Sequence, residues 1–281
     1  VDSQANCPLD EPAVAALCTR LLAAPRRVGQ VNNNRSSLRD NIALQHRFAP
    51  ADGLRLLWGT EWRYDRIESD FLFHDGRRPS QQEWRLFGNA EWRIAPEWLW
   101  NVGAMAEHIQ ADRLRFAPRV FLNWQPHDNM TWRMGYSRAW RQPTLYERWA
   151  NVQVSVEGLG VVNQRHTPNP DIRPQQIDTW EIGYLGSTPW GGLLDVRVFD
   201  ERIEDYIRRT PINLATPFAP SNALNAATGG NPFTIHQVMG ATQWANMPGR
   251  IRLTGIEYQL SLKPRRGTPP MFTHTLMQRR A

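Results

Sequence analysis

The sequence contains almost no lysine, no long apolar run and no familiar catalytic motif. Lys263 is the only lysine, so 32 of the 33 basic residues are arginines. No stretch approaches the roughly 18 to 20 uninterrupted apolar residues of a membrane-spanning helix, which excludes helical channels and pumps. G-x-S-x-G, H-E-x-x-H and phosphate-binding glycine loops are missing. The many carboxylates alternate with arginines on predicted strand faces, so we expect neither an enzyme nor a cofactor.

Cysteine is scarce as well. Cys7 and Cys18 are the only two, and their separation by ten residues fits neither a C-x-x-C redox pair nor a zinc knuckle. In an oxidising compartment they would close one loop, whereas in the cytosol they would be two inert thiols. Their spacing alone does not decide between these states.

The positive charge is dispersed rather than clustered. A formal net charge of +6 would permit nucleic-acid binding. The arginines, however, are spread along the chain beside acidic residues, and no basic run is longer than two residues. We therefore expect no nucleic-acid partner.

Alternation of apolar and polar residues is the strongest positive signal. From Leu54 to Asp65 the even positions are mainly apolar and the odd positions mainly polar, and similar patterns recur around Trp92, Trp124, Trp132 and Trp180. A period of two with two different faces indicates a strand between two different media. The pattern predicts ten long antiparallel strands, at 37–49, 54–67, 82–95, 98–110, 114–125, 130–141, 175–188, 192–207, 249–263 and 271–278.

The length of these strands favours a membrane over a soluble core. Runs of about 12 to 15 residues exceed the roughly 9 to 11 that cross a bilayer obliquely. Several of the 13 tryptophans lie near strand ends, as in the aromatic girdles of outer-membrane barrels. We expect Trp62, Trp92 and Trp180 to face lipid and Arg63, Arg93 and Glu181 to face an aqueous interior. The alternative is a tryptophan-rich soluble β-protein, for example one that binds sugars, with the indoles in a sealed core.

The connections between the predicted strands sort into two kinds. Short links near 50–53, 96–97, 126–129 and 188–191 alternate with longer links at 68–81, 142–174 and 208–248, apart from a brief one near 111–113. Short turns on one rim and long loops on the extracellular rim are typical of outer-membrane barrels. Within the strand near Gly255 the apolar phase slips, and we expect a β-bulge there.

The first 36 residues have a different character. Apolar residues recur at helical spacing from Val14 to Leu22, between Pro12 and Pro25, which predicts a short helix. We divide the chain into an extracellular loop with this helix, 1–36, and a partial barrel, 37–281. On this division Cys7 and Cys18 meet oxidising conditions, and we favour a disulfide between them.

Four local patterns go beyond periodicity. They are Gly135-Tyr-Ser-Arg-Ala-Trp-Arg-Gln-Pro-Thr-Leu-Tyr-Glu147; Asn169-Pro-Asp-Ile-Arg-Pro-Gln175 leading into Trp180-Glu-Ile-Gly-Tyr184; Leu194-Asp-Val-Arg-Val-Phe-Asp200 with Ile203-Glu-Asp-Tyr-Ile207; and Gly255-Ile-Glu-Tyr-Gln-Leu260. In this order and at these distances, across about 36–264, they resemble the C-terminal half of the barrel of TonB-dependent outer-membrane receptors. We expect these motifs to shape the barrel rather than to contact ligand.

The resemblance implies an all-β transmembrane barrel of about 22 strands around a plug, energised by the TonB complex. This sequence departs from that pattern: it has about ten strands, no plug, no TonB-binding segment and no terminal aromatic residue. We therefore expect a piece of a receptor in a Gram-negative outer membrane, in contact with the lipid bilayer and lipopolysaccharide. It would meet TonB only through an N-terminal region not in this sequence.

The resemblance also implies a ligand, a ferric siderophore or a similar metal chelate. Such chelates are commonly anionic and bulky, which suits arginine and aromatic side chains. The loop candidates are Arg77, Arg78, Tyr146, Arg148, Trp149, Arg165 and His166. His166 lies where haem-uptake members of the family carry an axial histidine, so a haem receptor is one alternative. A pore or adhesin barrel without energised transport is the other.

Overall fold

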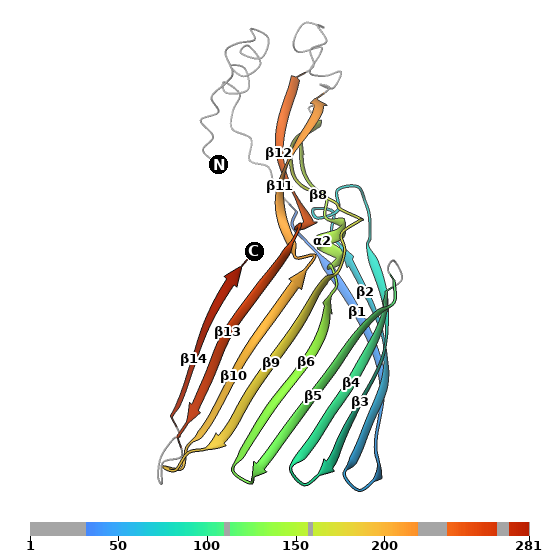
Figure 1. The fold of residues 1–281 in the computed structure, drawn as a ribbon. Helices are drawn as coiled ribbons and strands as arrows, with labels where there is room; N and C mark the ends of the chain where they lie inside the picture. The colour runs from blue at the N-terminus through green and yellow to red at the C-terminus, as the bar shows by residue number, and fades with distance from the viewer. Residues whose placement is uncertain (1–31, 110–112, 157–159, 219–234, 263–269, 281) are drawn as a thin grey trace, which may run out of the picture.

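The chain forms one large curved sheet with a smaller sheet at one end (Figure 1). The computed structural model describes residues 32–109, 113–156, 160–218, 235–262 and 270–280. The large sheet has ten strands, β1 (Ser36–Ala51), β2 (Leu54–Glu68), β3 (Ser80–Ala95), β4 (Trp98–Ile109), β5 (Arg115–His127), β6 (Met130–Arg141), β9 (Gln175–Ser187), β10 (Leu193–Glu204), β13 (Arg250–Ser261) and β14 (Met271–Arg280). Their order across the sheet follows the chain and all neighbours are antiparallel. The ten predicted strands are thus confirmed.

The connections also sort as expected. The turns β1–β2, β3–β4, β5–β6 and β9–β10 are short and lie at the same end, which we call the short-turn rim (Figure 1). The first of these turns uses Gly53 at a φ of 75°, a left-handed conformation that favours glycine. The longer connections lie at the opposite end, the long-loop rim. The sheet is open, with β1 and β14 as its edges.

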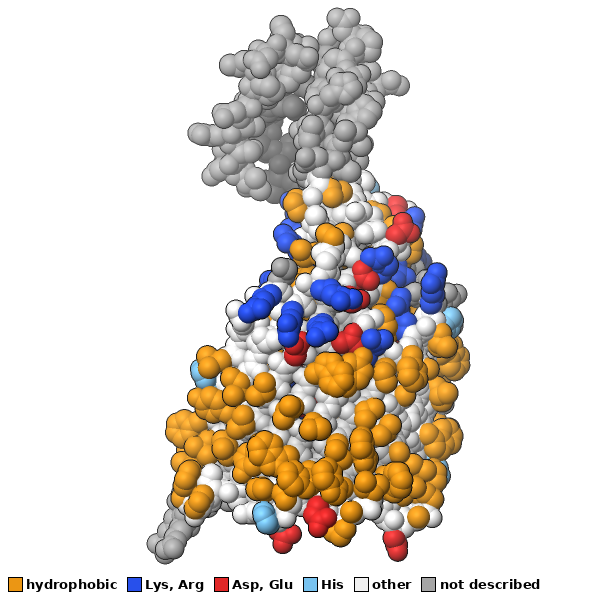
Figure 2. Space-filling view, in the orientation of Figure 1, with side chains coloured by type: hydrophobic (Ala, Val, Ile, Leu, Met, Phe, Trp, Pro, Cys, Tyr) orange, Lys and Arg blue, Asp and Glu red, His pale blue; other side chains and the backbone are white. Residues whose placement is uncertain are grey.

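The two faces of the sheet differ as the alternation predicts. Trp92 is 54% exposed and Trp180 is 56% exposed, whereas the side chain of Glu181, the inward-facing residue next to Trp180, is only 9% exposed. Trp62 packs beside Trp84 on the outward face, and Arg93 donates to the carbonyl of Pro96 at the short-turn rim. Figure 2 shows outward apolar side chains as a broad band across the visible face of the sheet. The indoles are not in a sealed core between two sheets, which removes the soluble alternative.

Two of the long links contain strands of their own, which the alternation of apolar and polar residues did not predict. The link 142–174 contains helix α2 (Leu145–Trp149) and strands β7 (Val152–Val156) and β8 (Gly160–Thr167), and the link 208–248 contains most of β11 (Ile207–Phe218) and β12 (Ile235–Asn246). These strands form the second sheet, in the order β11-β12-β8-β7, with β12 and β8 parallel. β7 pairs with β8, and β11 with β12, as antiparallel neighbours along the chain. The pairing of β12 with β8 joins residues 76 positions apart, Thr242 and His166, and no short-range repeat in the sequence signals it.

The predicted strand 192–207 is also divided. β10 ends at Glu204, and Asp205 has a positive φ of 53° before β11 begins at Ile207 in the other sheet. Aspartate tolerates this left-handed conformation better than most residues with a side chain. The carboxylate of Asp205 also forms an ion pair with the guanidinium of Arg173 at 2.5 Å, and this contact stabilises the bend.

The bulge predicted near Gly255 is absent from the register of β13. The pairing of β13 with β10 and with β14 is continuous through Gly255. The phase of the apolar pattern slips because the surroundings of the strand change along its length. The backbone itself stays regular. Ile251 is buried on the inward face near the long-loop rim, while Ile256 and Tyr258 lie on the outward face in the apolar band.

The predicted helix and both cysteines, Cys7 and Cys18, lie outside the described residues, so the disulfide stays a prediction. The division of the chain into 1–36 and 37–281 likewise stays a prediction. In the part of the chain that is described, no helix is long and apolar enough to cross a membrane.

A pair of adjacent substitutions tests the assignment of the two faces. Val102 on β4 is outward-facing and exposed, whereas Asn101 is inward-facing. We expect Val102→Arg to lower the free energy of unfolding in a bilayer by about 2–4 kcal/mol, because an arginine on the lipid face is costly near the midplane. Asn101→Arg is the matched control and changes stability much less. Urea titration in phospholipid vesicles measures both, and equal losses would contradict the assignment.

Candidate functional site

A cavity of about 460 Å³ opens at the long-loop rim between the inner wall of β1–β3 and the segment that leads into α2. Its strand side carries Arg39, Arg63 and Gln81, and its other side carries Gln142 and Tyr146. The remaining lining residues are Ser37, Leu38, Asp65, Arg66, Ile67, Pro143, Thr144 and Leu145. The cavity therefore joins one end of the large sheet to the first of the long links.

Local sequence fixes the segment that holds Tyr146. Pro143 ends the strand pairing of β6 because it has no N–H to donate. Thr144 then caps α2: its hydroxyl accepts from the N–H of Glu147 at 3.1 Å, and the Glu147 carboxylate accepts from the N–H of Thr144 at 2.9 Å. This capping box satisfies two backbone donors at the start of a very short helix. Arg141 also pairs with Glu147 at 2.5 Å, which ties α2 to the end of β6.

An apolar cluster supports the other side of α2. Its buried members are Leu72, Phe73 and Val152, with Ile67, Phe71, Tyr146 and Trp149 packed against them. Phe73 also forms a β-bridge to Asn151, so the connection 69–79 is attached to the start of β7. Arg77 lies over the ring of Trp149, with its guanidinium carbon 4.8 Å from the ring centroid. The loop next to the cavity is therefore a packed structure.

Charged residues on the inner wall form a network beneath the cavity. Arg63 pairs with Asp65 at 3.0 Å and with the carboxylate of Glu83. Arg85 pairs with Glu83 and, at 3.0 Å, with Glu107. Because Glu83 and Glu107 are 2% and 3% exposed, these carboxylates depend on their arginine partners. The side-chain amide of Gln142 donates to Glu107 and so connects the network to the cavity.

His166 lies inside the smaller sheet and not on its surface. Its side chain is 3% exposed and its ring stacks on Tyr146, with 5.7 Å between ring centroids. Nδ1 is 3.0 Å from the hydroxyl of Thr242, and Nε2 has no hydrogen-bond partner among the described residues. Burial, together with the nearby positive charge of Arg209, lowers the pKa of His166 to about 4. The imidazole is therefore neutral at physiological pH.

The loop residues singled out from the sequence fall into two groups. Arg77, Arg78 and Arg165 are exposed, whereas Arg148 and His166 are buried and Tyr146 and Trp149 are partly buried. A guanidinium nitrogen of Arg148 donates to the carbonyl of Ile172 at 3.4 Å, so this side chain supports the fold. Of the set, only Tyr146 lines the cavity.

Sequence reasoning missed Arg39 and Gln142 as candidates for the site. Arg39 is 65% exposed and pairs with Asp65 at 2.5 Å at the cavity wall. The available signal was its position: it is an inward-facing arginine at the loop end of a predicted strand, next to Arg63 on the neighbouring strand. That signal becomes useful only when the register of β1 and β2 is known.

The cavity suits a bulky anion better than a bare metal ion. Its lining includes three arginines and one carboxylate, that of Asp65. Arg63 and Arg66 also pair with Glu83 and Glu68, so Arg39, which is 65% exposed, is the arginine most open to a ligand. Guanidinium groups offer several hydrogen-bond donors to carboxylate or catecholate oxygens. Within the described residues, no group of three histidine, cysteine or acidic side chains is arranged to hold a metal ion.

The strands are long and antiparallel, with an apolar outward face and a charged inward face, and they are joined by short turns on one rim and folded loops on the other. These features define the chain as part of an outer-membrane β-barrel. The family model described as "TonB dependent receptor-like, beta-barrel" matches residues 15–276. The chain belongs to this family of TonB-dependent receptors and is located in the outer membrane of a Gram-negative bacterium. The long-loop rim is accordingly the extracellular one.

The relatives found by sequence and by structure agree with this assignment. An iron-regulated outer membrane virulence protein of Vibrio cholerae is 25% identical over 193 residues, which is 66% of this chain but only 28% of that protein. The siderophore receptor PirA of Pseudomonas aeruginosa has a TM-score of 0.62 at 13% identity, with 87% of this chain and 40% of that chain covered. The Serratia marcescens hemophore receptor HasR has a TM-score of 0.61 at 16% identity, covering 86% and 42%. The structural likenesses show the fold.

Protonation of His166 predicts how the stability of the smaller sheet depends on pH. Because its pKa is lower in the folded protein than the ordinary value near 6.5, the unfolded segment binds a proton first as the pH falls. Stability of the sheet is full above about pH 6.5, declines as the pH falls toward 4 and then levels off, with a total loss of about 1–3 kcal/mol. Hydrogen exchange of the β8 and β12 amides measures this decline.

His166→Phe keeps a ring next to Tyr146 and removes the titrating group. We expect this variant to lose the decline between pH 6.5 and 4. The matched control is His127→Gln, at an exposed position on the short-turn rim. A decline that persists in His166→Phe would assign the pH dependence to another group.

Proposed function

We propose that this chain forms part of a receptor that takes up a ferric siderophore or a similar anionic metal chelate. The observation that carries the proposal is the cavity at the extracellular end of the inner wall, where Arg39 and Arg63 face Tyr146. The names of two relatives, an iron-regulated outer membrane virulence protein and a siderophore receptor, support the same ligand class. The family consists of transport receptors, and we infer that the chain has no enzymatic activity.

We infer further that the chain acts together with additional barrel strands. Both edges of the sheet, β1 and β14, are exposed along their whole length. Unpaired backbone groups at an open edge cannot be satisfied within hydrocarbon. The chain spans only 28% of the Vibrio relative and 40% of PirA. Energy coupling through TonB would then depend on parts of the receptor outside this sequence.

Arg39 offers a sharp test because the chain contains a matched control. Arg39 on β1 is 65% exposed and pairs with Asp65 on β2, while Arg55 on β2 is 66% exposed and pairs with Glu91 on β3, also on the inner wall but at the opposite rim. We expect Arg39→Gln to weaken binding of an anionic ferric chelate about tenfold or more, since a hydrogen bond to a charged group contributes about 1.5–3 kcal/mol. Arg55→Gln should leave affinity unchanged.

The probes are ferric catecholate, ferric hydroxamate and ferric citrate complexes, and binding is followed by quenching of tryptophan fluorescence in the whole receptor. Affinity that falls for Arg39→Gln alone supports the site. Equal affinity in both variants places the ligand elsewhere. Failure of the unmodified receptor to bind any of the chelates would favour the pore or adhesin alternative.

Haem is a second candidate ligand, because the unpartnered Nε2 of His166 has the chemistry of an axial ligand. The fold likeness to HasR, solved with its hemophore and heme, is consistent with it. His166 is buried against Tyr146, however, so coordination requires that the smaller sheet open. If haem is the ligand, adding it to the receptor shifts the Soret band and His166→Ala abolishes that shift. An identical spectrum in the variant ends this candidate.

A further inference from the structure

One histidine connects the strand pair β11–β12 to the cavity. His166 on β8 lies opposite Thr242 on β12, where the two strands pair in parallel. The Thr242 hydroxyl donates to the carbonyl of Arg165 at 2.9 Å. A hydroxyl has a single proton, so the same oxygen accepts at its 3.0 Å contact with Nδ1 of His166. Nδ1 therefore carries the proton of the neutral imidazole, and β12 fixes both the tautomer and one edge of the ring.

The ring of His166 has two aromatic neighbours. It stacks on Tyr146, with 5.7 Å between the ring centroids and an angle of 12° between the ring planes. Trp244, which belongs to β12 as Thr242 does, lies 6.4 Å away at an angle of 60°. Because His166 is only 3% exposed, its ring has no room to turn away from Tyr146 while β12 stays in place.

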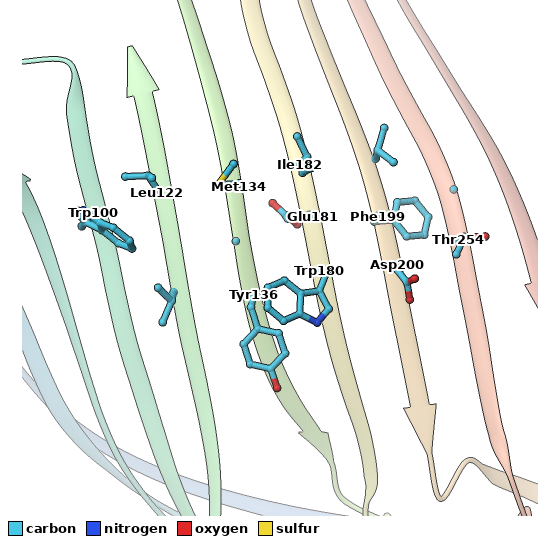
Figure 3. Close-up of a pocket in the computed structure, with 14 residues that line it drawn as sticks. Trp100, Leu122, Met134, Tyr136, Trp180, Glu181, Ile182, Phe199, Asp200 and Thr254 are labelled. Atoms are coloured by element: carbon cyan, nitrogen blue, oxygen red, sulfur yellow. The ribbon is translucent and has the colours of Figure 1, made fainter. Parts of the chain in front are cut away.

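Tyr146 depends on such contacts because it lies outside the large sheet. On β6 and β9 the rings of Tyr136 and Trp180 contact each other from paired strands, and the strand pairing fixes where they lie (Figure 3). Tyr146 instead belongs to α2, a helix of only five residues, which has little stability of its own. The apolar cluster around Phe73 and the ring of His166 both contact Tyr146, and the second of these contacts leads to β12.

We propose that β12 positions the Tyr146 ring at the cavity through Thr242 and His166, so that the strand pair β11–β12 sets the affinity of the cavity for its ligand. The inference rests on the proposed function, because it concerns the cavity where Arg39 faces Tyr146. His166 is a positioning residue in this arrangement: it acts on the ligand through Tyr146 and stays in place when the ligand binds. Coordination of haem makes the opposite demand, that His166 leave Tyr146. Because coupling between two sites is reciprocal, a ligand that contacts Tyr146 also stabilises the attachment of β12.

Two substitutions of Thr242 test the connection. Thr242→Val keeps the branched side chain and removes the hydroxyl, so Nδ1–H of His166 loses its acceptor. A hydrogen bond contributes about 0.5–1.5 kcal/mol, and we expect the affinity for the ferric catecholate, hydroxamate or citrate complex that binds to fall about threefold to tenfold. Thr242→Ser keeps the hydroxyl and should bind like the unmodified receptor.

Gln243→Leu is the matched control. Gln243 is next to Thr242 on β12, and its side-chain amide donates to the carbonyl of Pro168 at 2.8 Å. The substitution removes a hydrogen bond between the same two segments and leaves that of His166 in place. We expect unchanged affinity. An equal loss of affinity in Gln243→Leu and Thr242→Val would overturn the proposal, because any loosening of β12 would then have the same effect.

A second measurement needs no ligand and so separates this inference from the proposed function. Fluorotyrosine is placed at position 146 of the whole receptor, where its fluorine resonance reports the ring current of the stacked imidazole. We expect the resonance to move in Thr242→Val and to stay in place in Thr242→Ser and Gln243→Leu. An unmoved resonance in Thr242→Val, or a moved one with unchanged affinity, would overturn the proposal. A moved resonance in a receptor that binds none of the three chelates would contradict the uptake function and support the positioning of Tyr146 by β12.

Discussion

The structure depends on one constraint, that every strand of the large sheet separates hydrocarbon from water. Side chains alternate between the two media, so a single period of two dictates Trp180 outside and Glu181 inside at consecutive positions. The backbone must be paired throughout, because lipid supplies no hydrogen bonds. Charged residues on the inner wall then accumulate in a confined space, where they are satisfied by each other.

That accumulation links stability to function at the extracellular end. Glu83 and Glu107 are buried and held by Arg63 and Arg85. Gln142 extends the same network to the segment that carries Tyr146. The proposed ligand cavity is therefore connected to this buried network, and Arg39, which is 65% exposed at its margin, is the residue most easily changed alone.

On the outer face of the sheet, the type of side chain likewise follows the medium that it meets, which is lipid in the apolar band and water beyond it. Where the strands leave hydrocarbon, the outward positions change from Ile182 and Trp180 to Asp178 over two steps. On β13 the corresponding change, from Ile256 to Arg252, produces the phase slip that resembled a bulge in the sequence. Interpreting the slip as a bulge was wrong because alternation alone cannot separate a backbone irregularity from a change of medium along a regular strand.

The sequence by itself determined the ten strands, their two faces and the sorting of the turns, because all three follow from residues close together in the chain. Only the tertiary structure decided how the long links fold. Thr242 pairs with His166 across 76 positions of sequence, and Arg39 meets Asp65 only through the register of β1 and β2. It also decided that His166 is buried and Arg77 exposed, since burial in a loop depends on which distant segment packs over it. Non-local packing leaves no periodic trace, and for that reason the site was harder to predict than the wall that supports it.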